Sequence, residues 1–194
     1  MSTEAVLDRL MEKFDLLGGR HYGENVTQRS HMEQAAHLAA TDGAPAALIA
    51  AALLHDFGHF LQRKGENAAR AGIDARHEAI GANYLARFFP DEVVQPILLH
   101  VNAKRFLCTT DKDYLLGLSE ASQQSLVLQG GLMSAAERSE FARHPYRADA
   151  LRLRRYDDLA KQTDADVPGV ASYRGMLIDL MQHPAGRMRA ALPR

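Results

Sequence analysis

The sequence predicts an all-α fold, organised as a single helical bundle. Apolar residues recur three and four positions apart along much of the chain, which is the period of an amphipathic helix. Glycines, prolines and capping residues separate these stretches, and few alternating or β-branched runs indicate strands. A length of 194 residues without an internal repeat, a low-complexity segment or a clear linker favours one domain over residues 1–194.

The first half of the chain is predicted to contain four helices. They cover residues up to 17, then about 25–40, 46–62 and 75–88. Gly18-Gly19 breaks the first helix, and Asp42-Gly43 is a turn signal after the second. Pro45 suits the start of the third helix, and Pro90 follows the end of the fourth. The stretch between the third and fourth helices, 65–72, is predicted to be a loop.

The second half carries recognisable helix starts. The later helices are predicted to begin at Asp91, at Ser119 and at Ser134, and then to cover about 146–161 and 172–182. Pro96 predicts an irregular start to the helix that Asp91 caps. Gly130-Gly131 ends the helix that Ser119 caps, and Ser134 with Glu137 forms a predicted capping box.

The composition is that of an ordinary globular protein, with 46% hydrophobic and 24% charged residues. A formal net charge of -1 without a long basic run argues against nucleic-acid binding through a cationic face. Cys108 is the only cysteine, so no intramolecular disulfide forms. No signal peptide and no apolar run near the ~20 residues that span a membrane are present. We therefore expect a soluble cytoplasmic protein without nucleic-acid or membrane partners.

The stretch LLHDFGHF places polar groups at the end of an apolar segment. Burying them costs free energy unless they are paired or bound, which leaves a hydrogen-bonded cluster or a metal site. His55 and Asp56 are adjacent and diverge by about 100° on a regular helix. They serve one cluster only at a helix end, or if Asp56 bridges two ions. Further candidate ligands lie on separate predicted helices: His31, His77, His100 and Asp157.

These side chains offer the chemistry of a metal centre. Histidine nitrogens and carboxylates suit iron, manganese and zinc, and four histidines with two aspartates are enough for two ions with open positions. Basic groups lie one turn from three of the candidates: His59 after His55, Lys104 after His100 and Arg154 before Asp157. They predict an anion pocket beside the metals, with Arg154 suited to phosphate or phosphonate. The alternative to an anion pocket is that these basic residues are ordinary charged groups exposed to solvent.

The candidate ligands resemble the H…HD…D pattern of the HD-domain superfamily, and the additional histidines resemble its mixed-valent diiron oxygenases, related to myo-inositol oxygenase. Within that family, the chain is similar to small enzymes that cleave 1-hydroxy-2-(amino or trimethylammonio)ethylphosphonates. The resemblance covers about 22–173, the expected core of the domain. It rests on GENVTQRSHMEQ, AALLHDFGHF, RHEAIGANYL, HVNAKRFL, LSEASQQSLVLQGGLM and RLRRYDDLAKQTDADVPG.

The resemblance implies a role for each matched residue. The implied iron ligands are His31, His55, Asp56, His77, His100 and Asp157, with Asp56 as the catalytic bridge between two irons. The implied phosphonate ligands are His59, Lys104, Arg154, Ser122, Ser125 and Gln129. Glu24 matches a catalytic glutamate that occupies an iron position before substrate arrives. The tyrosine that partners it in the family falls at His21 here, with Tyr22 one residue later, so either residue takes that place.

The resemblance also implies an activity. A small hydroxyphosphonate would be cleaved at its carbon–phosphorus bond, with O2 as co-substrate and an Fe(II)/Fe(III) pair as cofactor. Phosphate and glycine or glycine betaine would be released. The alternative is a metal-dependent HD phosphohydrolase that acts on a small phosphate ester, and a degenerate sensor domain is disfavoured because all six ligand positions are filled. The choice between a primary amine and a trimethylammonium group, the stereochemical preference and the oligomeric state are left open.

Overall fold

A computed structural model describes residues 2–21, 25–62 and 76–183. Its regular elements are helices throughout, with no strand among these residues, which confirms the all-α prediction. Within the same ranges, no helix combines the length and the apolar character that crossing a membrane requires. The elements are α1 (Thr3–Leu17), α2 (Gln28–Thr41), α3 (Ala46–Leu54), η1 (Phe57–Leu61), α5 (His77–Leu85), α6 (Asp91–Thr110), α7 (Lys112–Leu116), α8 (Glu120–Leu128), α9 (Ala135–Arg143), α10 (Arg147–Leu159), η2 (Val170–Tyr173) and α11 (Arg174–Gln182).

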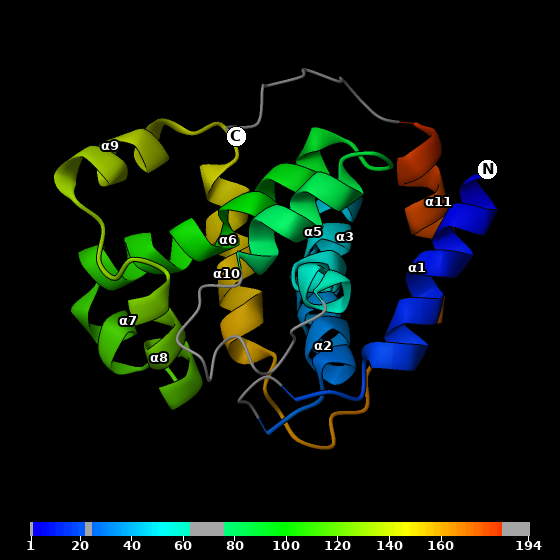
Figure 1. The fold of residues 1–194 in the computed structure, drawn as a ribbon, viewed down its shortest axis with the longest axis horizontal. Coiled ribbons are helices and arrows are strands. Elements are labelled where there is room, and N and C mark those ends of the chain that lie inside the picture. Colours follow the sequence, from blue (N-terminus) through cyan, green and yellow to red (C-terminus); the bar gives the residue numbers. More distant parts are fainter. Residues whose placement is uncertain (1, 22–24, 63–75, 184–194) are drawn as a thin grey trace.

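Four helices form the centre of the bundle. These are α2, α3, α6 and α10: α2 packs on α3, α6 packs on α10, and α3 and α10 each contact all three other helices of the group. α1 and α11 lie together on one flank in Figure 1, and α7, α8 and α9 lie on the opposite flank. α3 is apolar on all sides, with Leu53 and Leu54 almost fully buried, as expected for a helix that other helices surround. The residues that follow α3 therefore lie deep inside the molecule.

Local capping signals correctly predicted several helix boundaries. The Ser119 hydroxyl accepts from the Ser122 amide at the start of α8, and Ser134 with Glu137 forms the predicted capping box of α9. The predicted cap at Asp91 is wrong, because Pro90 occupies the cap position and Asp91 is the first residue of α6. The predicted irregularity at Pro96 is wrong too: α6 is one helix from Asp91 to Thr110 and includes Pro96, which lacks the N–H for one backbone bond.

The largest difference from the prediction is the end of α3. The helix predicted over 46–62 ends at Leu54, and the chain re-forms as the short 3-10 helix η1. A Cβ added to Gly58 would lie 1.9 Å from the carbonyl oxygen of His77, so the two backbones pass in direct contact. Gly81 in α5 faces the Gly58 backbone in the same way. This close approach between η1 and α5 directly follows the break in the chain at His55 and Asp56.

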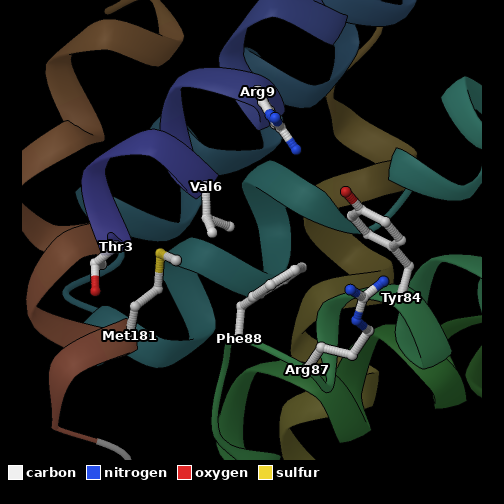
Figure 2. A pocket seen from close by; sticks show the side chains of 7 residues that line it. All are labelled: Thr3, Val6, Arg9, Tyr84, Arg87, Phe88 and Met181. Atoms are coloured by element: carbon white, nitrogen blue, oxygen red, sulfur yellow. The ribbon is translucent and has the colours of Figure 1, made fainter. Parts of the chain in front are cut away.

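A surface pocket lies where α1, α5 and α11 meet, and Figure 2 shows the side chains that line it. Arg87 covers the rings of Tyr84 and Phe88, at 5.5 and 5.1 Å from their centroids. The remaining lining residues are Thr3, Val6, Arg9 and Met181. None of the residues predicted to hold metal or phosphonate lines this pocket, so it is separate from the candidate site.

Candidate metal centre

The six predicted metal ligands converge at the centre of the bundle. α2 supplies His31, the break after α3 supplies His55 and Asp56, and three other helices supply one residue each: His77 from α5, His100 from α6 and Asp157 from α10. Every one of these side chains is at most 14% exposed. The sequence prediction that these residues lie together therefore agrees with the described geometry.

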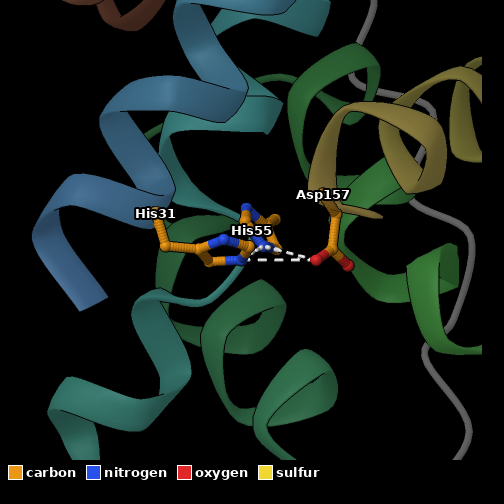
Figure 3. A group of neighbouring side chains, drawn as sticks. All are labelled: His31, His55 and Asp157. Atoms are coloured by element: carbon orange, nitrogen blue, oxygen red, sulfur yellow. Dashed lines mark hydrogen bonds and ion pairs between the residues drawn. The ribbon is translucent and has the colours of Figure 1, made fainter. Parts of the chain in front are cut away.

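Three of these residues define a first candidate metal position, drawn in Figure 3. His31 Nε2 lies 3.1 Å from His55 Nε2 and 3.3 Å from Asp157 Oδ1. His55 Nε2 lies 3.9 Å from the same carboxylate oxygen. The three ligand atoms thus point at one small volume from three separate elements, which is the arrangement that a bound cation requires.

A second candidate metal position lies on the other side of Asp56. His77 Nε2 and His100 Nε2 are 3.1 Å apart, and Asp56 Oδ1 lies 3.3 and 3.8 Å from them. The other Asp56 oxygen, Oδ2, lies 3.8 Å from His31 Nε2 and accepts a 2.7 Å hydrogen bond from Gln28. The Asp56 carboxylate thus faces both groups of histidines, as a bridging ligand must.

The second nitrogen of three histidines is tied to a backbone carbonyl. Nδ1 of His31 lies 2.9 Å from Ala160 O, Nδ1 of His55 lies 2.9 Å from Ala52 O, and Nδ1 of His100 lies 2.7 Å from Ile97 O. Because a carbonyl only accepts, each Nδ1 carries the proton and Nε2 presents its lone pair to the centre. Pairs of Nε2 lone pairs 3.1 Å apart repel unless a proton or a cation lies between them, so the donor set fits metal ions.

The electrostatics of the site also favour cations. Burial alone would raise the pKa of the Asp157 and Asp56 carboxyls, but neighbouring positive groups, Arg154 foremost for Asp157 and His55 for Asp56, hold both well below their usual range. Burial opposes charge on His31, yet the carboxylates of Asp157 and Asp56 outweigh it and raise the pKa of His31 to about 9. The carboxylates that raise the pKa of His31 offer the same negative charge to a metal ion.

The predicted anion ligands Lys104 and Arg154 are both buried beside this centre. Lys104 Nζ donates to Ser125 Oγ over 2.8 Å. Burial, and then the charge of Arg154, lower the pKa of Lys104 to about 8. Arg154 Nη1 donates to Asp157 Oδ2 over 2.7 Å, and other guanidinium donors reach both Asp158 oxygens and Tyr114 Oη. Arg154 therefore holds a candidate metal ligand in place as well as offering positive charge.

The predicted serines lie at the start and middle of α8. Ser122 is buried, and its hydroxyl accepts from Lys161 Nζ over 3.2 Å. Lys161 also donates to Ser119, whereas Lys104 reaches Ser125 from α6. Gln129 caps the other end of α8, and its Oε1 is buried without a hydrogen-bond partner among the described residues. Two lysines thus approach the same face of α8 from different elements.

His59 differs from its predicted setting. It lies in η1 rather than one regular helical turn after His55. Its ring stacks on that of His77, with centroids 4.2 Å apart and 14° between the planes. Burial and the adjacent histidine charges lower the pKa of His59 to about 3, so it is neutral at pH 7. Together with Asp56 and His77 it also forms a trio with metal-ligand spacing.

Of Glu24 and its two possible partners, Tyr22 and His21, the structure describes only His21. Tyr22 and Glu24 lie outside the described residues, so the geometry does not bear on their predicted roles. His21, the alternative to Tyr22, is described and lies at an exposed position.

Several residues of the site were not assigned their present roles from the sequence. Gln28 supports Asp56, Tyr114 and Asp158 support Arg154, and Lys161 supports Ser122. Gln28 lies three residues before His31, and Asp158 directly follows Asp157, so proximity to a ligand was the available signal. No sequence signal indicated Tyr114, because it reaches the site from α7, a short helix that the sequence pattern did not predict.

Comparisons with known proteins agree with this arrangement. The HD-domain family matches residues 29–151. The hydroxymethylphosphonate dioxygenase of Gimesia maris is 45% identical over 180 residues, covering 91% of this chain and 90% of that protein. The glycine-betaine-forming 1-hydroxy-2-(trimethylamino)ethylphosphonate dioxygenase of Leisingera caerulea is 42% identical over 156 residues, or 80% of each chain. The expected resemblance to HD-domain proteins and to phosphonate-cleaving dioxygenases is confirmed.

Proposed function

Because the chain belongs to the HD-domain family, we propose that it is a diiron oxygenase that uses O2 to cleave the carbon–phosphorus bond of a small 1-hydroxyphosphonate. The convergence of four histidines and two aspartates into two groups around Asp56 carries this proposal. The names of both relatives describe substrates with a hydroxyl group and a phosphonate. We therefore propose phosphate as one product and the carboxylate formed from C1 as the other.

The proposed substrate class includes three members. The sequence favours 1-hydroxyethylphosphonates with an amino or trimethylammonio group at C2, which give glycine or glycine betaine. The Gimesia maris relative adds hydroxymethylphosphonate, which lacks C2 and would give formate. Hydroxymethylphosphonate and O2 together contain the atoms of formate and dihydrogen phosphate, so the reaction balances without another reductant or oxidant.

We propose that His31, His55 and Asp157 hold one iron, that His77 and His100 hold the other, and that Asp56 bridges them. When bound, the iron pair supplies the redox chemistry with O2 and polarises the substrate hydroxyl. The protein orients these ligands through carbonyls 52, 97 and 160 and through Gln28. The functional domain then extends beyond the matched residues 29–151, at least to Asp157.

The phosphonate is proposed to lie beside the metals, against Lys104, Arg154 and α8. Lys104 is buried with a single described hydrogen bond, to Ser125, and retains donors for an anion. Ser122 and Ser125 add hydroxyls, and Lys161 adds a second lysine that sequence reasoning missed. His59 contributes hydrogen bonding rather than charge, since it is neutral at pH 7. Gln129 keeps its proposed place at the end of α8.

Glu24 is proposed to occupy an iron position before substrate enters, with Tyr22 as its partner and His21 as the alternative to Tyr22. This assignment rests on the resemblance alone. The proposal for Asp56 has further support, because its contacts with both histidine groups fit a catalytic role as a bridge.

The test is release of phosphate from the three hydroxyphosphonates with and without O2. We expect release from at least one of them in air and none under anaerobic conditions. Methylphosphonate, which lacks the C1 hydroxyl, is the matched control and should give none. Failure of all three in the iron-loaded protein would refute the proposal, and anaerobic hydrolysis of a phosphate ester would identify a metal-dependent phosphohydrolase instead.

A further inference from the structure

Glu78 is a buried carboxylate that the proposed chemistry does not use. It follows His77 in the first turn of α5, and its side chain is 13% exposed. Its Oε2 atom is buried and has no hydrogen-bond partner among the described residues. Leaving a carboxylate oxygen in this state is costly, so it requires an explanation. The Oε2 atom lies 3.6 Å from Nδ1 of His77.

This setting makes His77 different from the other three histidines of the centre. His31, His55 and His100 each have Nδ1 within 2.9 Å of a neutral backbone carbonyl. For His77, the one partner described near Nδ1 is the carboxylate of Glu78. A carboxylate accepts a hydrogen bond more strongly than a carbonyl, because it carries a full negative charge.

We propose that Glu78 is a positioning residue that accepts the Nδ1 proton of His77 and thereby strengthens metal binding at the second position. This inference rests on the proposed role of His77 as a metal ligand. A metal on Nε2 withdraws electrons from the imidazole ring and makes Nδ1–H a better donor. Closing the gap from 3.6 Å to the roughly 2.8 Å of a charge-assisted bond requires only a small movement of one carboxylate.

The two metal positions then differ in their surroundings. At the first position, the charge of Asp157 is shared with Arg154, whose Nη1 lies 2.7 Å away. At the second position, the ion pair described for Glu78 is with the ligand His77 itself. Negative charge behind an imidazole increases its basicity and its affinity for a cation. Removing the Glu78 charge should therefore weaken the second position and spare the first.

The experiment is a titration of the metal-free protein with Co(II), followed by absorbance, which needs neither iron nor turnover. Glu78→Gln should weaken one of the two bound equivalents by about 10- to 100-fold and leave the other unchanged. Glu92→Gln is the matched control, because Glu92 Oε2 is also buried without a described partner but lies eight residues before His100 on α6. Wild-type affinity for both equivalents in Glu78→Gln would overturn the proposal.

A measurement on the unaltered protein keeps the proposal testable if Glu78→Gln does not fold. With Zn(II) bound, nitrogen-labelled histidine should show four slowly exchanging Nδ1 protons at the centre, one for each ligand ring. Only three, those held by the carbonyls, would contradict a role for Glu78. If the wild-type chain binds fewer than two Co(II) ions, the proposed metal centre fails. Loss of O2-dependent turnover with two bound ions would leave the Glu78 inference standing.

Discussion

Replacing Lys104 with methionine should stabilise the protein while impairing its function. Lys104 is 2% exposed and donates one described hydrogen bond, to Ser125. The lowering of its pKa from 10.5 to about 8, caused mainly by burial, corresponds to about 3 kcal/mol that the folded protein spends to keep the charge at pH 7. Loss of the Ser125 bond subtracts about 1 kcal/mol from the gain. Lys104→Met should therefore raise the free energy of unfolding by about 2 kcal/mol.

Thermal unfolding at pH 7 checks this value, which corresponds to a rise of about 4–8 °C for a chain of this size. The extra stability of Lys104→Met over the wild type should shrink as pH rises from about 8 to 10.5. In that range the unfolded wild-type chain binds the Lys104 proton and the folded wild-type chain does not. Wild-type stability therefore rises with pH relative to Lys104→Met. A lower melting temperature in Lys104→Met, or a constant difference across this range, would refute the reasoning.

The same variant should raise KM for the hydroxyphosphonate by about 10- to 100-fold, the effect of losing one hydrogen bond to a charged group. Its metal content should stay normal, since no described hydrogen bond or salt bridge joins Lys104 to a proposed ligand. Lys112→Met, at an exposed position in α7, is the matched control and should change neither KM nor melting temperature. An unchanged KM in Lys104→Met would remove Lys104 from the proposed phosphonate site.

Four further outcomes are expected. Arg154→Met should lose metal from the first position and about 3–5 kcal/mol of stability, because it leaves Asp157 buried without its partner; full metal content by elemental analysis would contradict this. Asp56→Asn should abolish the coupled diiron signal in electron paramagnetic resonance, whereas an unchanged signal excludes it as the bridge. The value of kcat/KM should fall above about pH 8 as Lys104 loses its proton, and Lys104→Arg should remove that decline. Lys161→Met should raise KM at constant metal content, and a normal KM would show that Lys161 only supports α8.

The sequence predicted those parts of the fold that depend on local signals. Ser119 and the Ser134–Glu137 box define helix starts through bonds within four residues, and both predictions are confirmed. Pro96 did not disturb α6 as predicted, because the helix continues through it and forgoes only the backbone bond that proline cannot donate. α7 was missed because five residues are too few for an apolar period to appear.

The residues of the site were easier to predict than their partners. Histidine and aspartate are costly inside an apolar bundle, so their positions stood out in the sequence. Arg154 also stood out, as an anion ligand, but its bonds to Tyr114 and Asp158 depend on how α7 packs against α10. These contacts change what its removal should do: a residue that would only weaken substrate binding becomes one on which Asp157 depends.

The break after α3 explains how two adjacent residues can serve two metal positions. On a continuous helix, His55 and Asp56 would point about 100° apart. The helix instead ends at Leu54, and Asp56 adopts backbone angles of -97° and 8° outside the regular helix. Just after the break, the Gly58 backbone contacts the His77 carbonyl, nineteen residues later in the sequence, and this contact leaves no local trace. The same contact places the start of α5 beside η1, so Asp56 and His77 meet from two segments that lie apart in the sequence.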